Sequence, residues 1–268
     1  MPLPALLAVT ALAGAAALSS RAQAGSRARM TAAQAAAHKA RLVELLKGGR
    51  WRDALESNKA EGGRKLDLRG VDLSGANLTD ADLTGANLTG AKLSGAKLFG
   101  AWLSDADLAY ANLTNADLTD ANLVNAKLIW SGLCGANLTG TNLTNADLAY
   151  ANLTNANLTN ANLTDANLTG ADLASAELFS ANLTNANLTN ANLTGANLTD
   201  AGLAYANLTN ANLTNANLSG ADLGGASIPD GFLVSGARLD AVPWKGIPYG
   251  WRIIASPRGA RFLPLSEA

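Results

Sequence analysis

Hydrophobic and polar residues recur with a period of five over most of this chain. The unit reads Ala, then Asn or Asp, then Leu, then two variable residues, and it runs in unbroken phase from Leu66 to Asp230. Leu occupies the centre of 32 of the 33 units, and Ile228 occupies the last. Ala stands two positions before the centre in 29 units, and the exceptions are Leu66, Val71, Ser131 and Thr141.

A period of five fits neither a long helix nor a flat strand. In an α-helix, each fifth residue would move about 140° around the axis and leave no continuous apolar stripe. In a strand, successive Leu residues would face opposite sides. A short extended piece with Ala and Leu pointing inward, followed by a bend at the two variable residues, restores the phase in every unit. The pattern therefore predicts an all-β solenoid with a core of Leu and Ala, and with Asn and Thr only facing solvent.

The repeat A-(D/N)-L-x-x resembles the consensus of the pentapeptide-repeat family over 165 of the 268 residues. This resemblance implies a right-handed quadrilateral parallel β-helix with four units per coil, and hence about eight coils. Residues 20 apart would then stack, which would place Lys127 between Asp107 and Asp147. We expect the structural core to include Leu68, Leu88, Leu108, Leu128, Leu148, Leu158, Leu168, Leu188 and Leu208.

Residues 1–24 resemble a signal or targeting peptide. An apolar run from Ala5 to Leu18 is followed by Ala22-Gln23-Ala24, a small-x-small pattern that is typical of a cleavage site. The run is too short for a stable membrane span, and no Lys or Arg precedes it. The apolar run and the small-x-small pattern predict export to a periplasm, the exterior or an organelle such as the thylakoid lumen, whereas the missing positive charge counts against it. The alternative is a cytoplasmic protein whose translation starts at Met30.

Residues 25–65 are predicted to form a linker and a helical N-terminal cap. Thr31 is a suitable N-cap for a helix that ends near Gly48, and a second helix is expected from Trp51 to Lys59. The first coil of a solenoid exposes an apolar end, which such a cap would cover. Trp51 and Leu55 are the expected contacts.

Residues 231–268 are far more aromatic than the repeat region. We expect two short strands, Trp251 to Ile254 and Arg261 to Leu263, in a β or irregular cap at the other end. A surface that docks a partner is the alternative interpretation of this tail.

Charge is unevenly distributed along the chain. Residues 1–65 contain 11 Lys or Arg against 4 Asp or Glu, residues 66–230 contain 4 against 15, and residues 231–268 contain 5 against 2. The repeat region is thus acidic and both ends are basic. The single cysteine, Cys134, allows no intrachain disulfide and is expected to face outward.

No residue pattern predicts catalysis, a metal site or a cofactor site. His38 is the only histidine, and no cysteine lies near it in the sequence to complete a metal site. The carboxylates are spaced by the repeat on an exposed wall, and the glycines of the fifth position are bend residues rather than a phosphate loop. We therefore expect neither enzymatic activity nor a cofactor.

Aromatic residues interrupt the polar wall. Tyr110, Trp130 and Tyr150 are 20 apart at the same position of the unit, which predicts an exposed aromatic ladder. The ladder would either stiffen the solenoid or bind a partner. The full set of candidate interaction residues is Tyr110, Trp130, Tyr150, Phe99, Trp102, Trp244 and Trp251.

The sequence is best interpreted as a non-enzymatic structural or interaction scaffold, whose partner, if it has one, would be another protein. The alternative, implied by the family resemblance, is a DNA mimic that binds a type II topoisomerase and confers quinolone resistance. We expect no direct nucleic-acid binding, no membrane span in the mature chain, and either a monomer or an end-to-end dimer. The 16 Asn-Leu-Thr/Ser triplets would invite glycosylation in a eukaryotic secretory route, so a bacterial or organellar setting is favoured.

Overall fold

The computed structural model describes residues 31–60 and 65–227, and the backbone of residues 251–254 and 261–264. Its contacts divide the chain into two compact units, Met1–His38 and Lys39–Ala268. The predicted targeting peptide and most of the C-terminal tail, including Trp244, lie outside the described residues.

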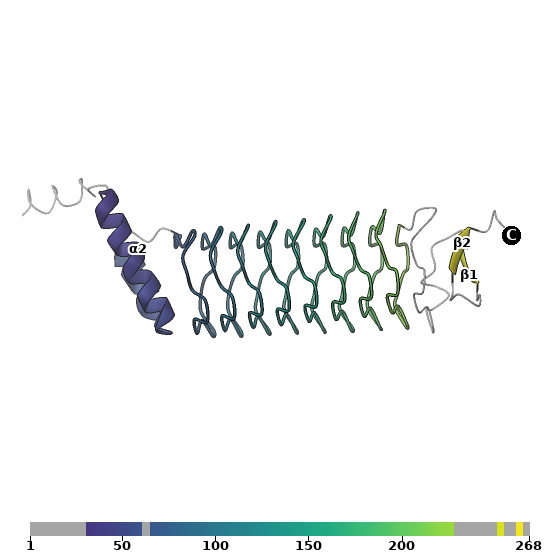
Figure 1. Ribbon diagram of the computed structural model, residues 1–268, viewed down its shortest axis with the longest axis horizontal. Coiled ribbons are helices and arrows are strands. Elements are labelled where there is room, and N and C mark those ends of the chain that lie inside the picture. The colour runs from purple at the N-terminus through teal and green to yellow at the C-terminus, as the bar shows by residue number, and fades with distance from the viewer. Residues whose placement is uncertain (1–30, 61–64, 228–250, 255–260, 265–268) are drawn as a thin grey trace, which may run out of the picture. The chain divides into compact units, whose positions relative to one another are not determined.

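The repeats form a solenoid of stacked coils (Figure 1). The residue before each central Leu makes an isolated parallel bridge to the residue 20 positions later, from the pair Asp67–Asn87 to the pair Asn207–Ser227. Four five-residue units therefore complete one coil. Only one residue per unit pairs in this way, because the chain bends again before a longer strand can form.

Backbone hydrogen bonds join each coil to the next. The amide of Leu108 donates to the carbonyl of Lys127 at 2.7 Å, and the amide of Lys127 donates to the carbonyl of Ala106 at 2.9 Å. Within the same coil, the amide of Ala111 donates to the carbonyl of Leu108 at 3.0 Å and closes the turn. The pattern recurs in successive units, so the turns and the bridges satisfy most backbone groups of the wall.

The fifth residue of each unit has a left-handed backbone. Its φ lies between 52° and 60° where it is not glycine, and Gly220 has a φ of 73°. Glycine adopts this conformation freely, and Asn and Asp tolerate it better than larger residues do. This explains why Gly, Asn, Asp or Ser fills the position in all but four of the described units.

The central leucines and their partner alanines fill the interior. The nine leucines of the expected structural core, from Leu68 to Leu208, are at most 1% exposed. Two polar residues replace Ala in the interior: the Thr141 hydroxyl donates to the carbonyl of Leu118 at 2.9 Å, whereas the Ser131 hydroxyl has no partner among the described residues.

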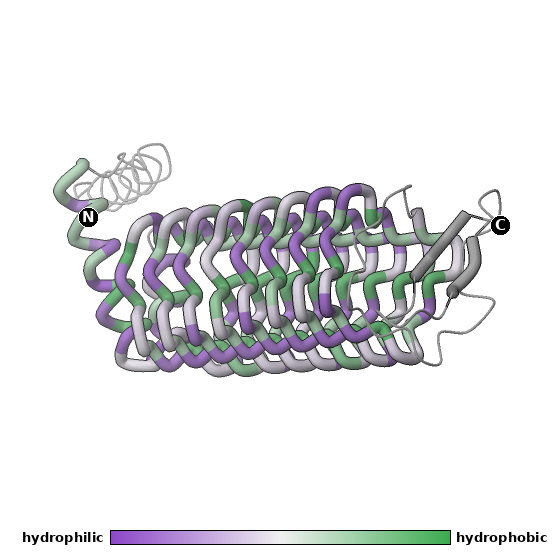
Figure 2. The backbone as a smooth tube through the Cα atoms, turned by 45° about the vertical axis from the view of Figure 1, so that its right-hand side comes forward, coloured by the Kyte–Doolittle hydropathy of each residue, from purple (hydrophilic) through white to green (hydrophobic). Residues whose placement is uncertain are grey.

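The Asn and Thr residues do more than face solvent, contrary to the sequence-based expectation. Asn187 Oδ1 accepts hydrogen bonds from the amide of Thr189 at 3.1 Å and from its hydroxyl at 2.6 Å. Asn187 Nδ2 donates to Thr169 Oγ1 in the preceding coil at 2.9 Å. One Asn can therefore hold its own turn and tie two coils together, which a side chain without both a donor and an acceptor cannot do. In Figure 2, hydrophilic positions recur from coil to coil along the wall.

Two helices precede the solenoid, α2 (Ala32–Lys47) and α3 (Trp51–Ala60). The N-cap prediction is confirmed, because Thr31 Oγ1 accepts from the amide of Gln34 at 3.2 Å and Gln34 Oε1 accepts from the amide of Thr31 at 2.8 Å. None of the helices in the described ranges is both long enough and apolar enough to cross a membrane.

The two helices share their apolar side with the solenoid core. Leu42 and Leu46 of α2 and Ala54 of α3 are buried in the same hydrophobic cluster as the repeat leucines. Trp51 and Leu55, the contacts expected from the sequence, are half-buried against that cluster.

The tail contains two antiparallel strands, β1 (Trp251–Ile254) and β2 (Arg261–Pro264). Their register pairs Trp251 with Pro264 and Ile254 with Arg261. The two predicted strands are therefore present, and the expected cap around them stays a prediction.

Candidate functional site

Three aromatic residues protrude from one corner of the solenoid on adjacent coils. Tyr110, Trp130 and Tyr150 each occupy the fifth position of a unit, and their side chains are 65%, 55% and 48% exposed. The sequence predicted a ladder of three rings, and the structure shows two stacked rings and a third that stands apart. Trp130 stacks on Tyr150 with ring centroids 4.7 Å apart and an angle of 12° between the planes. Tyr110 has no stacked ring partner among the described residues.

The ring of Tyr150, the last aromatic residue of the column, packs against Gly170. A Cβ atom at this glycine would lie 2.7 Å from both Cδ1 and Cε1 of Tyr150, which is closer than real Cβ atoms approach. The missing side chain therefore makes room for the tyrosine ring. Gly225 does the same for Tyr205, where the corresponding distances are 2.6 Å.

An apolar residue stands next to each of the three rings in the sequence. Ala109, Ile129 and Ala149 directly precede them, at a position where most other units have Thr. The sequence-based prediction missed these residues, although the units Ala-Asp-Leu-Ala-Tyr and Ala-Lys-Leu-Ile-Trp show the replacement. We define the aromatic patch as Ala109, Tyr110, Ile129, Trp130, Ala149 and Tyr150.

The backbone under the rings is conformationally unfavourable. The φ angles of Tyr110, Trp130 and Tyr150 are 60°, 57° and 58°. A non-glycine residue with a left-handed backbone costs about 1–2 kcal/mol, and the penalty is avoided by glycine and reduced by Asn or Asp. By their backbone conformation alone, Gly, Asn or Asp would suit these three turns better than Tyr or Trp.

A charged column adjoins the patch. Asp107, Lys127 and Asp147 occupy the bridge position of the same three units, and Lys127 pairs through its backbone with both aspartates, as the family resemblance implied. Asp107 Oδ1 accepts from the amide of Ala109 at 3.1 Å, and Asp147 Oδ1 accepts from that of Ala149 at 3.2 Å. These bonds orient the two carboxylates. Lys127 forms no side-chain ion pair within 4.0 Å in the described part of the chain.

Comparison with protein families gives a match over the same region. The model described as "Pentapeptide repeats" matches in eight copies at residues 67–105, 101–140, 136–174, 176–215 and 191–228. The chain belongs to the pentapeptide repeat family. No curated protein sequence matches it.

Several solved structures of pentapeptide repeat proteins are similar. HetL, which is involved in heterocyst differentiation regulation in the cyanobacterium Nostoc sp. strain PCC 7120, is 34% identical, with 70% of this chain and 96% of HetL covered and a TM-score of 0.27. A trypsin-treated variant of QnrB1, a plasmid-mediated fluoroquinolone resistance protein, is 22% identical, with coverages of 66% and 87% and a TM-score of 0.34. A protein of the Arabidopsis thaliana thylakoid lumen is 29% identical, with coverages of 52% and 68% and a TM-score of 0.14.

The other aromatic candidates of this pentapeptide repeat protein lie apart from the patch. Phe99 and Trp102 are 44% and 57% exposed and flank a different corner of one coil. Phe179 is 40% exposed. Trp251 lies in β1, and its side chain is outside the described residues, as is Trp244. The structure thus brings together three of the seven predicted residues.

The described residues offer little for metal or acid–base chemistry. They contain no group of three or more His, Cys, Asp and Glu residues that could hold a metal ion. His38 Nε2 is buried and has no hydrogen-bond partner in the described part. Cys134 is a half-buried free thiol.

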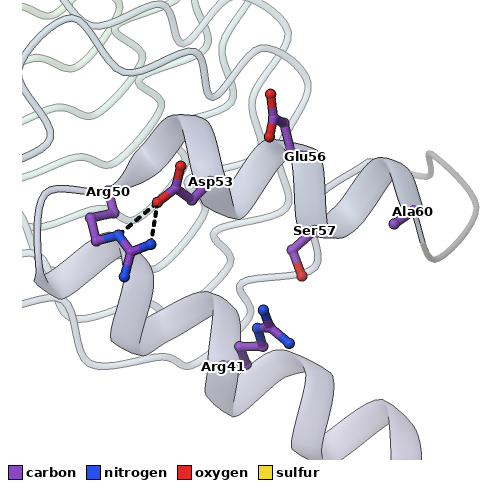
Figure 3. Close-up of a pocket in the computed structure, with 6 residues that line it drawn as sticks. All are labelled: Arg41, Arg50, Asp53, Glu56, Ser57 and Ala60. Atoms are coloured by element: carbon purple, nitrogen blue, oxygen red, sulfur yellow. Dashed lines mark hydrogen bonds and ion pairs between the residues drawn. The ribbon is translucent and has the colours of Figure 1, made fainter.

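A hollow of about 450 Å³ lies between the two helices (Figure 3). It is lined by Arg41, Arg50, Asp53, Glu56, Ser57 and Ala60. Within it, Arg50 Nε donates to Asp53 Oδ2 at 2.6 Å, so the positive charge of Arg50 is already paired. Acidic and basic groups are balanced here, and no ligand chemistry is favoured.

The clearest electrostatic shift lies at the first coil. Hydrogen bonds from the Arg69 side chain lower the pKa of Asp67 to about 2. The two groups form an ion pair with Nη2 and Oδ2 2.7 Å apart, and Lys39 of α2 lies 3.8 Å from Asp67 Oδ1. Hydrogen bonds that Asp72 accepts from Ser74 lower the pKa of this aspartate. These exposed pairs fit a structural role better than a catalytic one.

Proposed function

We propose that this chain is a non-enzymatic scaffold that presents the aromatic patch to a protein partner. The observation that carries the proposal is the placement of three large, exposed aromatic residues on a left-handed backbone, where nearly all other units have Gly, Asn, Asp or Ser. The rings cost stability at this position, and binding a partner is a function that would retain them.

The composition of the patch supports this function. Tyr and Trp offer large apolar contact areas with few rotatable bonds, and they are enriched at the centres of protein interfaces. The solenoid beneath them is held by a repeated hydrogen-bond ladder, so the rings are presented on a rigid wall. We also propose that α2 and α3 cap the first coil, because their buried leucines extend the solenoid core.

The proposal is tested by replacing the three rings with the repeat's own residue. The variant Tyr110→Asn, Trp130→Asn and Tyr150→Asn should keep its melting temperature within a few degrees or raise it, because Asn tolerates the left-handed backbone. Partners captured by the wild-type chain should be lost from this variant, as measured by quantitative affinity capture.

Tyr205→Asn is the matched control, since Tyr205 has the same position in its unit and a φ of 58° but no aromatic neighbour in its column. It should retain the partners. Collapse of the triple variant would show that the rings are structural, and unchanged capture would refute the interaction surface. Inhibition of gyrase supercoiling by the purified wild-type chain would instead support the DNA-mimicking alternative.

A further inference from the structure

We propose that the aromatic patch and the adjacent Asp107–Lys127–Asp147 column bind an extended segment with two arginines three residues apart, in the polyproline II conformation. This inference rests on the proposed function, in which the patch is an interaction surface, and it specifies the chemistry of the partner.

One five-residue unit occurs twice in the patch, on the coil before and on the coil after the one that carries Trp130. Residues 106–110 and 146–150 have the same sequence, Ala-Asp-Leu-Ala-Tyr. They lie two coils apart in one column, since each coil takes 20 residues. At the β-sheet spacing of about 4.8 Å per coil, the two Asp–Tyr pairs are separated by about 9.6 Å.

The two carboxylates are oriented and partly free. In each, Oδ1 accepts the turn hydrogen bond from the alanine amide two residues later. Asp147 Oδ1 also accepts from Asn167 Nδ2 at 2.9 Å. The Oδ2 atoms of Asp107 and Asp147 accept no hydrogen bond from the described residues, so each can receive a donor from a ligand.

Lys127 determines the charge pattern between these carboxylates. Lys127 is exposed and occupies the column position between Asp107 and Asp147, which gives the column the order negative, positive, negative. A ligand that fits this order has cations at the two ends and none in the middle, because like charges in contact disfavour binding.

The spacing selects the conformation of the ligand. A polyproline II helix has three residues per turn and rises about 3.1 Å per residue, so residues three apart share a face at about 9.3 Å. A β-strand does not fit, because residues three apart point to opposite sides. The pattern Arg-x-x-Arg in a polyproline II segment therefore matches the two Asp–Tyr pairs.

Arginine fits better than lysine at both ends. Its planar guanidinium binds a carboxylate through two hydrogen bonds and stacks on aromatic rings. Tyr110 is the most exposed ring of the patch, and it is not stacked on Trp130. Residues 128–227 contain six Asp or Glu residues and no Lys, Arg or His, so the field along this part of the solenoid also attracts a basic segment.

The test is fluorescence anisotropy of labelled peptides with the full chain at about 0.15 M salt, near the physiological screening length. The probe Pro-Arg-Pro-Pro-Arg-Pro is compared with the equally charged Pro-Arg-Pro-Arg-Pro-Pro and with a peptide that has lysine in place of both arginines. We expect at least tenfold weaker binding of the second peptide and clearly weaker binding of the lysine peptide. Equal binding of the two arginine spacings would overturn the inference.

A pair of double variants separates the site from general attraction. Asp107→Asn with Asp147→Asn should weaken binding of the first peptide at least tenfold, and the Asn oxygen can still accept the turn hydrogen bond. The control, Asp172→Asn with Asp222→Asn, removes the same charge from other faces, where the aspartates accept equivalent bonds from Ala174 and Gly224. The control should change binding less than threefold.

Equal weakening by both double variants would show nonspecific attraction and refute the proposal. If the triple aromatic variant loses natural partners while no peptide binds, the scaffold function stands and the arginine pattern is wrong. If the peptide binds but natural partners are unaffected by the triple variant, the scaffold proposal fails on its own.

Discussion

At the scale of single residues, each position of the unit is limited by a different physical demand. The centre must fill the interior, so Leu158 is fully buried. The alanine two positions earlier has room for a methyl group only, and Ala156 is likewise fully buried. The fifth position must accept a left-handed backbone, and its side chain must also fit against the residue 20 positions later. Gly170 and Gly225 meet the second demand, which cannot be seen in a single unit.

A pair of neighbouring substitutions tests the inward and outward assignments. Leu158→Ala should lower the free energy of unfolding by about 2–5 kcal/mol, because the rigid column cannot collapse onto the cavity. Thr159→Ser should change it by less than about 0.5 kcal/mol, because the half-exposed hydroxyl is retained. Urea titrations of both variants measure the difference, and equal effects would mean that the assignments are wrong.

At the scale of elements, charge and apolar burial join the N-terminal helices to the first coil. Lys39 Nζ of α2 donates to the carbonyl of Arg69 at 2.6 Å, next to the ion pair of Arg69 and Asp67. Leu42 and Leu46 of the same helix are buried in the solenoid cluster. The apolar contacts contribute most of the stability here, since the ion pair is largely exposed to water.

This charged cluster makes a pH-dependent contribution of known sign. The pKa of Asp67 is lowered from 3.8 to about 2 by Arg69, so its stabilising effect is full above pH 4 and is lost as the pH falls toward 2. Because the carboxylate is 51% exposed, we expect less than about 1 kcal/mol. Asp67→Asn should therefore be less stable than wild type at pH 5 and equal to it near pH 2, in urea titrations. The same difference at both pH values would contradict this assignment.

At the scale of the whole molecule, the solenoid is a linear array in which each coil contacts its neighbours. The bridges join residues 20 apart throughout residues 67–227, and successive coils carry nearly the same core residues. Stability should then be close to a sum over coils and their interfaces, as in other repeat proteins. In the proposed function, by contrast, binding specificity is concentrated where the wall departs from the consensus, on the three coils of the aromatic patch.

Removal of one coil tests this linear organisation. Residues 181–200 form a single consensus coil, and their deletion brings Ser180 next to Ala201 with every later residue in its original column. The shortened chain should fold with an unchanged far-UV circular dichroism shape and a urea m-value reduced by roughly one coil's share, because m follows the surface exposed on unfolding. An unfolded product, or an m-value equal to that of wild type, would contradict independent coils.

The sequence by itself determined the solenoid and its core, because a five-residue period of Leu and Ala can be buried only if the chain bends once per unit. It also indicated the helix N-cap at Thr31 and the exposure of Tyr110, Trp130 and Tyr150. The length of the coil could not follow from the period, since any whole number of units leaves the same residues inside. Only the tertiary structure showed that residues 20 apart are neighbours, and this contact places Tyr150 over Gly170 and makes one surface of Asp107, Lys127 and the aromatic patch.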